Sequence, residues 1–399
     1  MTPDQPDKAG QADAPANSAS AAPTALETSP PLAPDENVNI TFAGNPKTRA
    51  VRMVFSLGLG TAGGFLFHHF HFPLPWMLGP LVATTAASLL KFPLARPGRL
   101  RPMVVPVLGV MLGAGFTPDA VSRFHLWLFS LSTLLIYAAV ATAATAYYLA
   151  RRSRWDAPTA YFAASPGGFG AMVLLGEAMG ADERRVSLIH SVRIMLTVLI
   201  IPFWFKFHEG YQPGNMTALG DIGDLTLKDG ALLIACAVAG YYLASKLRLP
   251  AAQLLGPIVL SALVHLGGLT KAQPPQEVVA LAQIVIGASI GCRFLGVKLG
   301  EVFGIIIQAV GITVLMLGSA VGFAWGVSAV TGLPVETVCL AFAPGGLAEM
   351  SLIALSLGGD VAFVATHHMV RVSFLVSMAP FAFRLLRNVL DRLDAKAAG

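Results

Sequence analysis

Two His-x-x-Arg pairs lie inside segments that otherwise carry little charge. His190 and Arg193 form His-Ser-Val-Arg, and His368 and Arg371 form His-Met-Val-Arg. A spacing of three residues places both side chains on one face of a helix. An arginine deep in an apolar segment is costly and faces a cavity, a carboxylate partner or an anionic ligand. The pairs therefore predict an anion-binding site or a structural ion pair. The carboxylates available for such an ion pair are those of Asp182, Asp360 and Glu177.

A Pro-Gly-Gly sequence precedes each pair. Pro166, Gly167 and Gly168 lie in "SPGGFGAM", and Pro344, Gly345 and Gly346 lie in "APGGLAEM". Proline removes a helix donor and glycine permits a sharp turn, so each sequence predicts a break whose freed amides and helix ends can face a ligand. The alternative is a packing kink in a continuous helix. Two such sequences at equivalent positions favour a binding site.

The residues around the breaks complete the predicted site. Glu349 follows the second break, where the first has Ala171, and it would carry a proton, bind a cation or cap a half-helix. Ser165 would offer a hydroxyl. The predicted substrate-binding residues are Ser165, Pro166, Gly167, Gly168, Arg193, Pro344, Gly345, Gly346, Glu349 and Arg371. The predicted proton- or ion-coupling residues are Glu349, His190, His368, Asp182 and Asp360.

The composition indicates the elements that must hold these residues. Of 399 residues, 55% are hydrophobic and 12% are charged, with a mean hydropathy of +0.66. Soluble domains contain about 25% charged residues. Apolar runs such as 126–150 and 302–330 exceed the roughly 20 residues that a membrane-crossing helix needs. The sequence therefore predicts an all-α polytopic membrane protein.

The chain is an internal duplication. Pro344 follows Pro166 by 178 positions (344 − 166), and the same offset relates both His-x-x-Arg pairs. The duplicated regions are about 50–207 and 228–386. Each contains six apolar segments, which in the first half are about 51–68, 74–90, 102–118, 125–150, 157–180 and 186–207.

The basic residues predict how the halves are oriented. Lys and Arg concentrate in cytoplasmic loops. Six crossings per half would place Lys246 with Arg248, and Arg293 with Lys298, outside the cell. All four move inside if each Pro-Gly-Gly segment enters and returns on one side. The charges thus predict two inverted repeats, each with about five transmembrane helices plus one broken or re-entrant helix.

This topology divides the chain into five parts. They are a disordered cytoplasmic tail (1–45), a first membrane repeat (46–207), an extracytoplasmic linker (208–227), a second membrane repeat (228–386) and a cytoplasmic C-terminal tail (387–399). The predicted location is the bacterial inner membrane, with multiple passes and a cytoplasmic N-terminus. The motifs Gly109-x-x-x-Gly113 and Gly287-x-x-x-Gly291 predict close helix packing.

No motif predicts catalysis. His68, His69 and His71 lie at a helix end without a carboxylate, so we place them at the headgroup level and expect no metal site. No cofactor is expected.

With these motifs in view, the chain resembles the AbrB-duplication family of bacterial membrane proteins. The likeness covers about residues 50–390 and rests on "LPWMLGP" (74–80), the two Pro-Gly-Gly elements and the Arg-bearing helix after each. The family is labelled both as a regulator of gene expression and as an ammonia monooxygenase. The resemblance implies an inner-membrane protein with a regulatory role but no established substrate. The family pattern often has Glu where this chain has Ala171.

These observations predict a secondary transporter of a small polar or anionic solute. The alternative is a membrane-embedded sensor that changes gene expression indirectly, and an enzyme is not expected. The expected partners are the lipid bilayer and a small-molecule or ion substrate. Assembly into a homo-oligomer is left open, and no direct contact with nucleic acid is expected.

Overall fold

The computed structural model describes residues 46–118, 124–208, 220, 221, 223, 225–249, 251–297 and 299–398. These residues are almost entirely helices and short connections, with one isolated β-bridge between Gly220 and Pro275. The predicted N-terminal tail (1–45), most of the predicted linker (208–227) and Lys298 lie outside the described residues.

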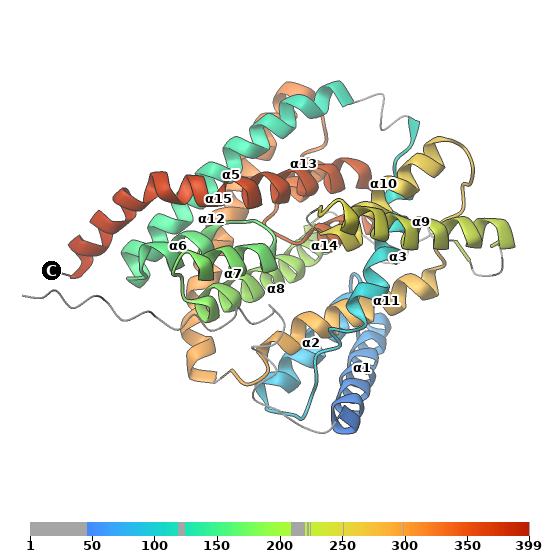
Figure 1. Cartoon of the computed structure of the whole chain (residues 1–399), viewed down its shortest axis with the longest axis horizontal. Helices are drawn as coiled ribbons and strands as arrows, with labels where there is room; N and C mark the ends of the chain where they lie inside the picture. The colour runs from blue at the N-terminus through green and yellow to red at the C-terminus, as the bar shows by residue number, and fades with distance from the viewer. Residues whose placement is uncertain are drawn as a thin grey trace, which may run out of the picture. The chain divides into compact units, whose positions relative to one another are not determined.

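Helices occupy every predicted apolar segment (Figure 1). The first half contains α1 (Pro46–His69), α2 (Pro75–Leu89), α3 (Arg101–Ala114), α5 (Phe124–Ser153), α6 (Ala157–Ala164), α7 (Phe169–Ala178) and α8 (Glu183–His208). The second half contains α9 (Leu227–Lys246), α10 (Ala252–Leu266), α11 (Gln276–Gly291), the 3-10 turn η4 (Cys292–Phe294), α12 (Leu299–Thr331), α13 (Val335–Phe342), α14 (Leu347–Ser356) and α15 (Val361–Ala398). In each half, the segment with Pro-Gly-Gly is divided into two helices.

Seven helices in the described part of the chain are long and apolar enough to cross a membrane. They are α1, α5, α8, α9, α11 continued by η4, α12 and α15. The helices α2, α3 and α10 have 14 or 15 residues. They are about 21–23 Å long at 1.5 Å per residue, less than the roughly 30 Å of a bilayer core. The prediction of helices long and apolar enough to span a membrane is therefore confirmed, and the five crossings predicted for each half would include helices shorter than this core.

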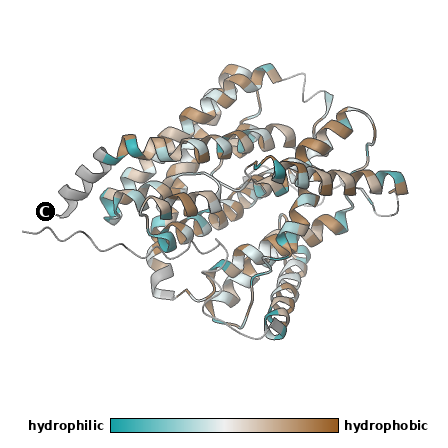
Figure 2. Cartoon of the chain, viewed as in Figure 1, coloured by the Kyte–Doolittle hydropathy of each residue, from teal (hydrophilic) through white to brown (hydrophobic). Residues whose placement is uncertain are grey.

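The spanning helices differ in how far they are buried. In the apolar stretches of α8 and α11, 67% and 72% of the residues are buried, whereas the other five helices have 22–39%. Figure 2 shows hydrophobic residues along the helices, with most of the strongly hydrophilic positions near helix ends. Helices with exposed apolar surface suit contact with lipid, so α8 and α11 are the inner elements.

Glycines allow several helices to approach closely. A Cβ on Gly109 would lie 2.8 Å from the carbonyl oxygen of Leu254, and one on Gly113 would meet the backbone of α10. Gly287 and Gly291 lie equally close to the backbone of α2. The predicted packing role of both Gly-x-x-x-Gly motifs is therefore confirmed. In both cases the contact joins helices from different halves of the sequence.

The same helix contacts occur in both halves. The pair α1–α2 corresponds to α9–α10, and the pair α3–α10 corresponds to α11–α2. In the same way, α8 packs against α12 while α15 packs against α5. The long helices α5 and α12 pack against each other.

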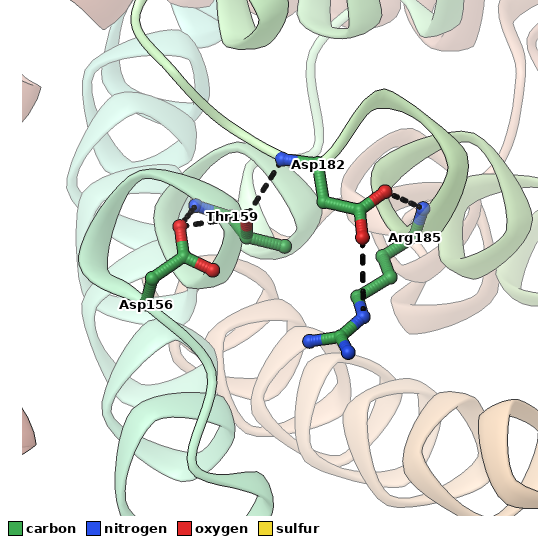
Figure 3. A network of polar contacts seen from close by, with 4 residues as sticks. All are labelled: Asp156, Thr159, Asp182 and Arg185. Carbon is green, nitrogen blue, oxygen red and sulfur yellow. Dashed lines mark hydrogen bonds and ion pairs between the residues drawn. The ribbon is translucent and has the colours of Figure 1, made fainter.

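Each Pro-Gly-Gly segment forms a helical hairpin. The hydroxyl oxygen of Thr159, near the start of α6, accepts a hydrogen bond from the backbone N–H of Asp182, beyond the end of α7, at 2.8 Å (Figure 3). A Cβ on Gly176 would lie 3.2 Å from Phe162 Cβ, so the two helices run side by side. In the second half, a Cβ on Gly359 would lie 3.9 Å from Thr337 Oγ1. The chain thus returns to the level at which it entered, and a kink in a continuous helix is excluded.

The hairpin predicts a disulfide cross-link. In a background without Cys236, Cys292 and Cys339, Thr159→Cys with Asp182→Cys should form an intramolecular disulfide on oxidation, detected as a gel-mobility shift. The control pair, Thr159→Cys with Phe207→Cys, should not react, because residue 207 lies 25 residues along α8 from residue 182, about 37 Å away. Equal cross-linking of both pairs would contradict the hairpin.

Candidate functional site

The first break is held by the His-x-x-Arg pair of α8. His190 Nε2 donates to the carbonyl oxygen of Phe162 at 2.9 Å, and its Nδ1 accepts from Arg193 Nη2 at 3.1 Å. Arg193 Nη1 donates to the carbonyl oxygen of Ser165 at 3.3 Å. Both side chains are buried, with 0% and 2% of their surface exposed. The pair therefore binds the C-terminal end of α6.

The second break repeats this arrangement on α15. His368 Nε2 donates to the carbonyl oxygen of Leu340 at 2.9 Å, and Nδ1 accepts from Arg371 Nη2 at 3.0 Å. The Arg371 guanidinium also donates to the carbonyl oxygens of Ala343 at 2.6 Å, Gly345 at 2.9 Å and Phe342 at 3.3 Å. Arg371 thus makes more bonds to the break than Arg193 does.

These hydrogen bonds provide partners for carbonyl groups that an interrupted helix leaves unpaired. The last carbonyls of a helix lack intrahelical partners, and leaving them unpaired in an apolar interior is costly. A cation is also favourable at a helix C-terminus, where the helix dipole is negative. Among the described residues, neither Arg193 nor Arg371 forms an ion pair. The arginines therefore meet backbone carbonyls instead of the carboxylates considered from the sequence.

The hydrogen-bond pattern fixes the tautomer of both histidines. A carbonyl oxygen only accepts, so the proton of each ring lies on Nε2, and Nδ1 accepts from arginine. Each imidazole is neutral in this arrangement and both of its nitrogens are engaged. A proton-carrying role for His190 or His368 stays a prediction, and it would require one of these bonds to open.

Asp182 and Asp360 lie at helix starts. Asp182 Oδ1 accepts from the backbone N–H of Arg185 at 3.0 Å, and Asp182 Oδ2 lies 3.3 Å from Arg185 Nε (Figure 3). Asp360 Oδ1 accepts from the backbone N–H of Phe363 at 2.9 Å. Eight residues separate each aspartate from the histidine of its helix, about 12 Å along the axis. Their contacts are those of helix caps, and a coupling role for them stays a prediction.

Glu349 lies at the N-terminal end of α14. It is 7% exposed, and a Cβ on Gly346 would collide with its carboxylate. Gly346 is the residue that precedes the first turn of α14. A negative group at a helix N-terminus is stabilised by the positive end of the dipole. This is the position that the capping interpretation requires, while a proton- or cation-binding role stays a prediction.

Arg293 is a site residue that the sequence analysis used only as a topology marker. Its guanidinium lies over the ring of Phe169, the first residue of α7, with Cζ 3.9 Å from the ring centroid. The edge of the same ring meets His190 at a centroid distance of 6.1 Å. The Arg293 atoms Nε and Nη1 are buried and have no hydrogen-bond partner among the residues that the structure describes. At the offset of 178 (293 − 115), Arg293 is equivalent to Gly115. An arginine in one half where the other half has a glycine is the feature of the sequence that could have indicated this residue.

His367 was also missed. This fully buried ring is hydrogen-bonded to the Ser130 hydroxyl through Nε2 at 2.7 Å and to the carbonyl of Phe363 through Nδ1 at 2.7 Å. Its equivalent in the first half is Ile189.

Within the described ranges, no group of three or more His, Cys, Asp or Glu side chains could hold a metal ion.

Comparison with known proteins places the chain in a family. The family described as "Transition state regulatory protein AbrB" matches residues 76–387. The chain belongs to the AbrB family. The chain is 29% identical over 379 residues to "Uncharacterized protein YhjN" of Bacillus subtilis (strain 168). This match covers 86% of this chain and 95% of the relative. The chain is 25% identical over 348 residues to "Putative regulator AbrB" of Escherichia coli (strain K12), covering 86% of this chain and 98% of the relative. No solved structure matches the chain.

The carbonyl contacts predict a ranking of stabilities. Arg371→Gln should lower the free energy of unfolding by about 3 kcal/mol, since several carbonyls at a buried helix end lose charged donors. Arg193→Gln should cost less, because Arg193 bonds to a single carbonyl. Thermal unfolding of the purified protein in detergent measures both. Arg185→Gln is the control and should change little, since its ion pair is half exposed. A larger loss for Arg193→Gln would contradict the ranking.

Proposed function

We propose that the protein is a secondary transporter of a small polar or anionic solute. The observation that carries this proposal is the pair of equivalent hairpins, in each of which a buried His-x-x-Arg pair binds the C-terminal carbonyls of the first helix. Because the carbonyl ends are neutralised by protein, the amide end of α7 is left to face a ligand, while that of α14 faces the Glu349 carboxylate. Broken helices whose amide ends face an anionic substrate are a recurring feature of secondary transporters.

We further propose that residues 46–207 and 228–386 are two repeats of opposite orientation in the membrane. The matching helix contacts of the two halves support this, as do the basic residues, which fall on one side only in the inverted arrangement. One hairpin would then enter from the cytoplasm and the other from outside. A site between two such hairpins can open alternately to each side.

In this proposal the site residues have distinct roles. Arg193 and Arg371 hold the breaks in shape and supply positive charge. The amides that follow Gly168 face the solute. Glu349 is the acid that takes up a proton or cation together with it.

A membrane sensor is the second candidate function. The name of the Escherichia coli relative, "Putative regulator AbrB", and the description of the family favour it. A sensor would bind its ligand without moving it and would pass the signal to a soluble partner.

The inverted arrangement predicts the accessibility of four single cysteines in a Cys-less protein. Probes at residues 182 and 247 should react only from the cytoplasm, and probes at 220 and 360 only from outside. Membrane-impermeant maleimide labelling of whole cells and inverted vesicles measures this. Parallel repeats would instead expose residue 220 to the cytoplasm and residue 182 to the outside.

Transport predicts flux in proteoliposomes. Uptake of radiolabelled small carboxylates, driven by an inward proton gradient, should exceed that of protein-free liposomes. Glu349→Gln should remove the dependence on the gradient, because the amide cannot take up a proton. Glu177→Gln, at an exposed acid on α7, should behave as the unmodified protein. Ligand binding without uptake would favour the sensor.

A further inference from the structure

The two breaks differ in the charges at their amide ends. At the second break the Glu349 carboxylate lies against Gly346, beside the first turn of α14. At the first break the residue equivalent to Glu349 is Ala171. A Cβ on Gly168 would meet only Val372 Cγ1, at 3.2 Å. The start of α14 therefore has its own anion, and in the described part of the chain no carboxylate takes the equivalent position at the start of α7.

A cation lies at the start of α7 instead. The Arg293 guanidinium stacks on Phe169 and has Arg101, Arg96 and Glu349 as its charged neighbours. A cation beside the positive end of a helix dipole is unfavourable unless an anion joins it. The start of α7 thus has a cation beside it, where the start of α14 has the Glu349 carboxylate.

Unused hydrogen-bond donors flank the Pro-Gly-Gly of the first break, one on Ser165 before it and two on Arg293, which stacks on Phe169 after it. Arg293 Nε and Nη1 are buried without a partner among the described residues, and so is the hydroxyl of Ser165, which is 0% exposed. Ser165 immediately precedes the Pro-Gly-Gly of this break, and its equivalent in the second half is Ala343. Leaving buried donors unpaired is costly. Two unrelated side chains from different halves of the sequence therefore require an acceptor here.

We propose that the first break, formed by residues 165–169 with Arg293, binds the carboxylate group of a small organic acid. This carboxylate takes the place of the one that Glu349 provides at the second break. A guanidinium donates strong charge-assisted hydrogen bonds to a carboxylate, and Phe169 holds that of Arg293 in orientation by a cation–π contact. That the bound acid is the transported solute rests on the function proposed above.

Binding is tested on the full-length protein in detergent by thermal unfolding. Sodium acetate and sodium benzoate are the probes, and acetamide and benzamide are their neutral counterparts. At least one carboxylate should raise the unfolding temperature above that in sodium chloride of equal ionic strength, because a ligand stabilises the state that it binds. The amides should not. The proposal is overturned if neither carboxylate exceeds its amide, or if sodium sulfate has the same effect as the carboxylates.

Substitutions locate the bound carboxylate. Arg293→Gln should weaken the affinity for the carboxylate by about tenfold or more, as expected for the loss of a charged donor. Arg185→Gln should leave this affinity unchanged. Ala171→Glu supplies an internal carboxylate and should remove the response, a test that does not depend on the folding of Arg293→Gln. An unchanged response in Ala171→Glu, or in a folded Arg293→Gln, would overturn the proposal.

Flux measurements separate this proposal from the transport function. Carboxylate binding that needs Arg293 but gives no uptake would retain the site and reject transport. Uptake that continues unchanged in Arg293→Gln would retain transport and reject the site.

Discussion

An interrupted helix inside an apolar interior must find partners for its last carbonyl groups. In this protein an arginine from a neighbouring helix provides them, and a histidine with one defined tautomer orients that arginine. The position of α8 against α6, and of α15 against α13, follows from this requirement. The turns are feasible because glycine and proline occupy the breaks. The rest of the interior is arranged around two such junctions.

The helices and both breaks could be predicted from sequence because their signals are local. Apolar run length, the Pro-Gly-Gly triplets and the Gly-x-x-x-Gly spacing each lie within a short stretch of chain. The hydrogen-bond partners of the two arginines could not be predicted. The sequence is the same whether the guanidinium binds distant carbonyl oxygens or pairs with Asp182. Arg293 was missed for a related reason. It contacts Phe169, which is 124 positions away in the sequence (293 − 169), and a contact at this separation leaves no local sequence pattern.

The two halves are close in structure and different in chemistry. Both retain the proline, the glycines, the histidine and the arginine, since these build the break itself. The differences concern groups that the break does not need: Ser165 opposite Ala343, Ala171 opposite Glu349 and Gly115 opposite Arg293. One break has gained unpaired donors and the other has kept an acid. The differences at these positions make the surroundings of the two breaks asymmetric.

The glycine contacts between α3 and α10, and between α11 and α2, have a consequence for how the protein is made. Helices α2 and α3 leave the ribosome before α10 and α11 exist, so they enter the bilayer with their closest packing surfaces uncovered. Lipid, or the insertion machinery, has to cover these surfaces until the second half is synthesised. These surfaces are therefore covered only after α10 and α11 have been made, and a product truncated before them would leave small-residue grooves open to other membrane proteins.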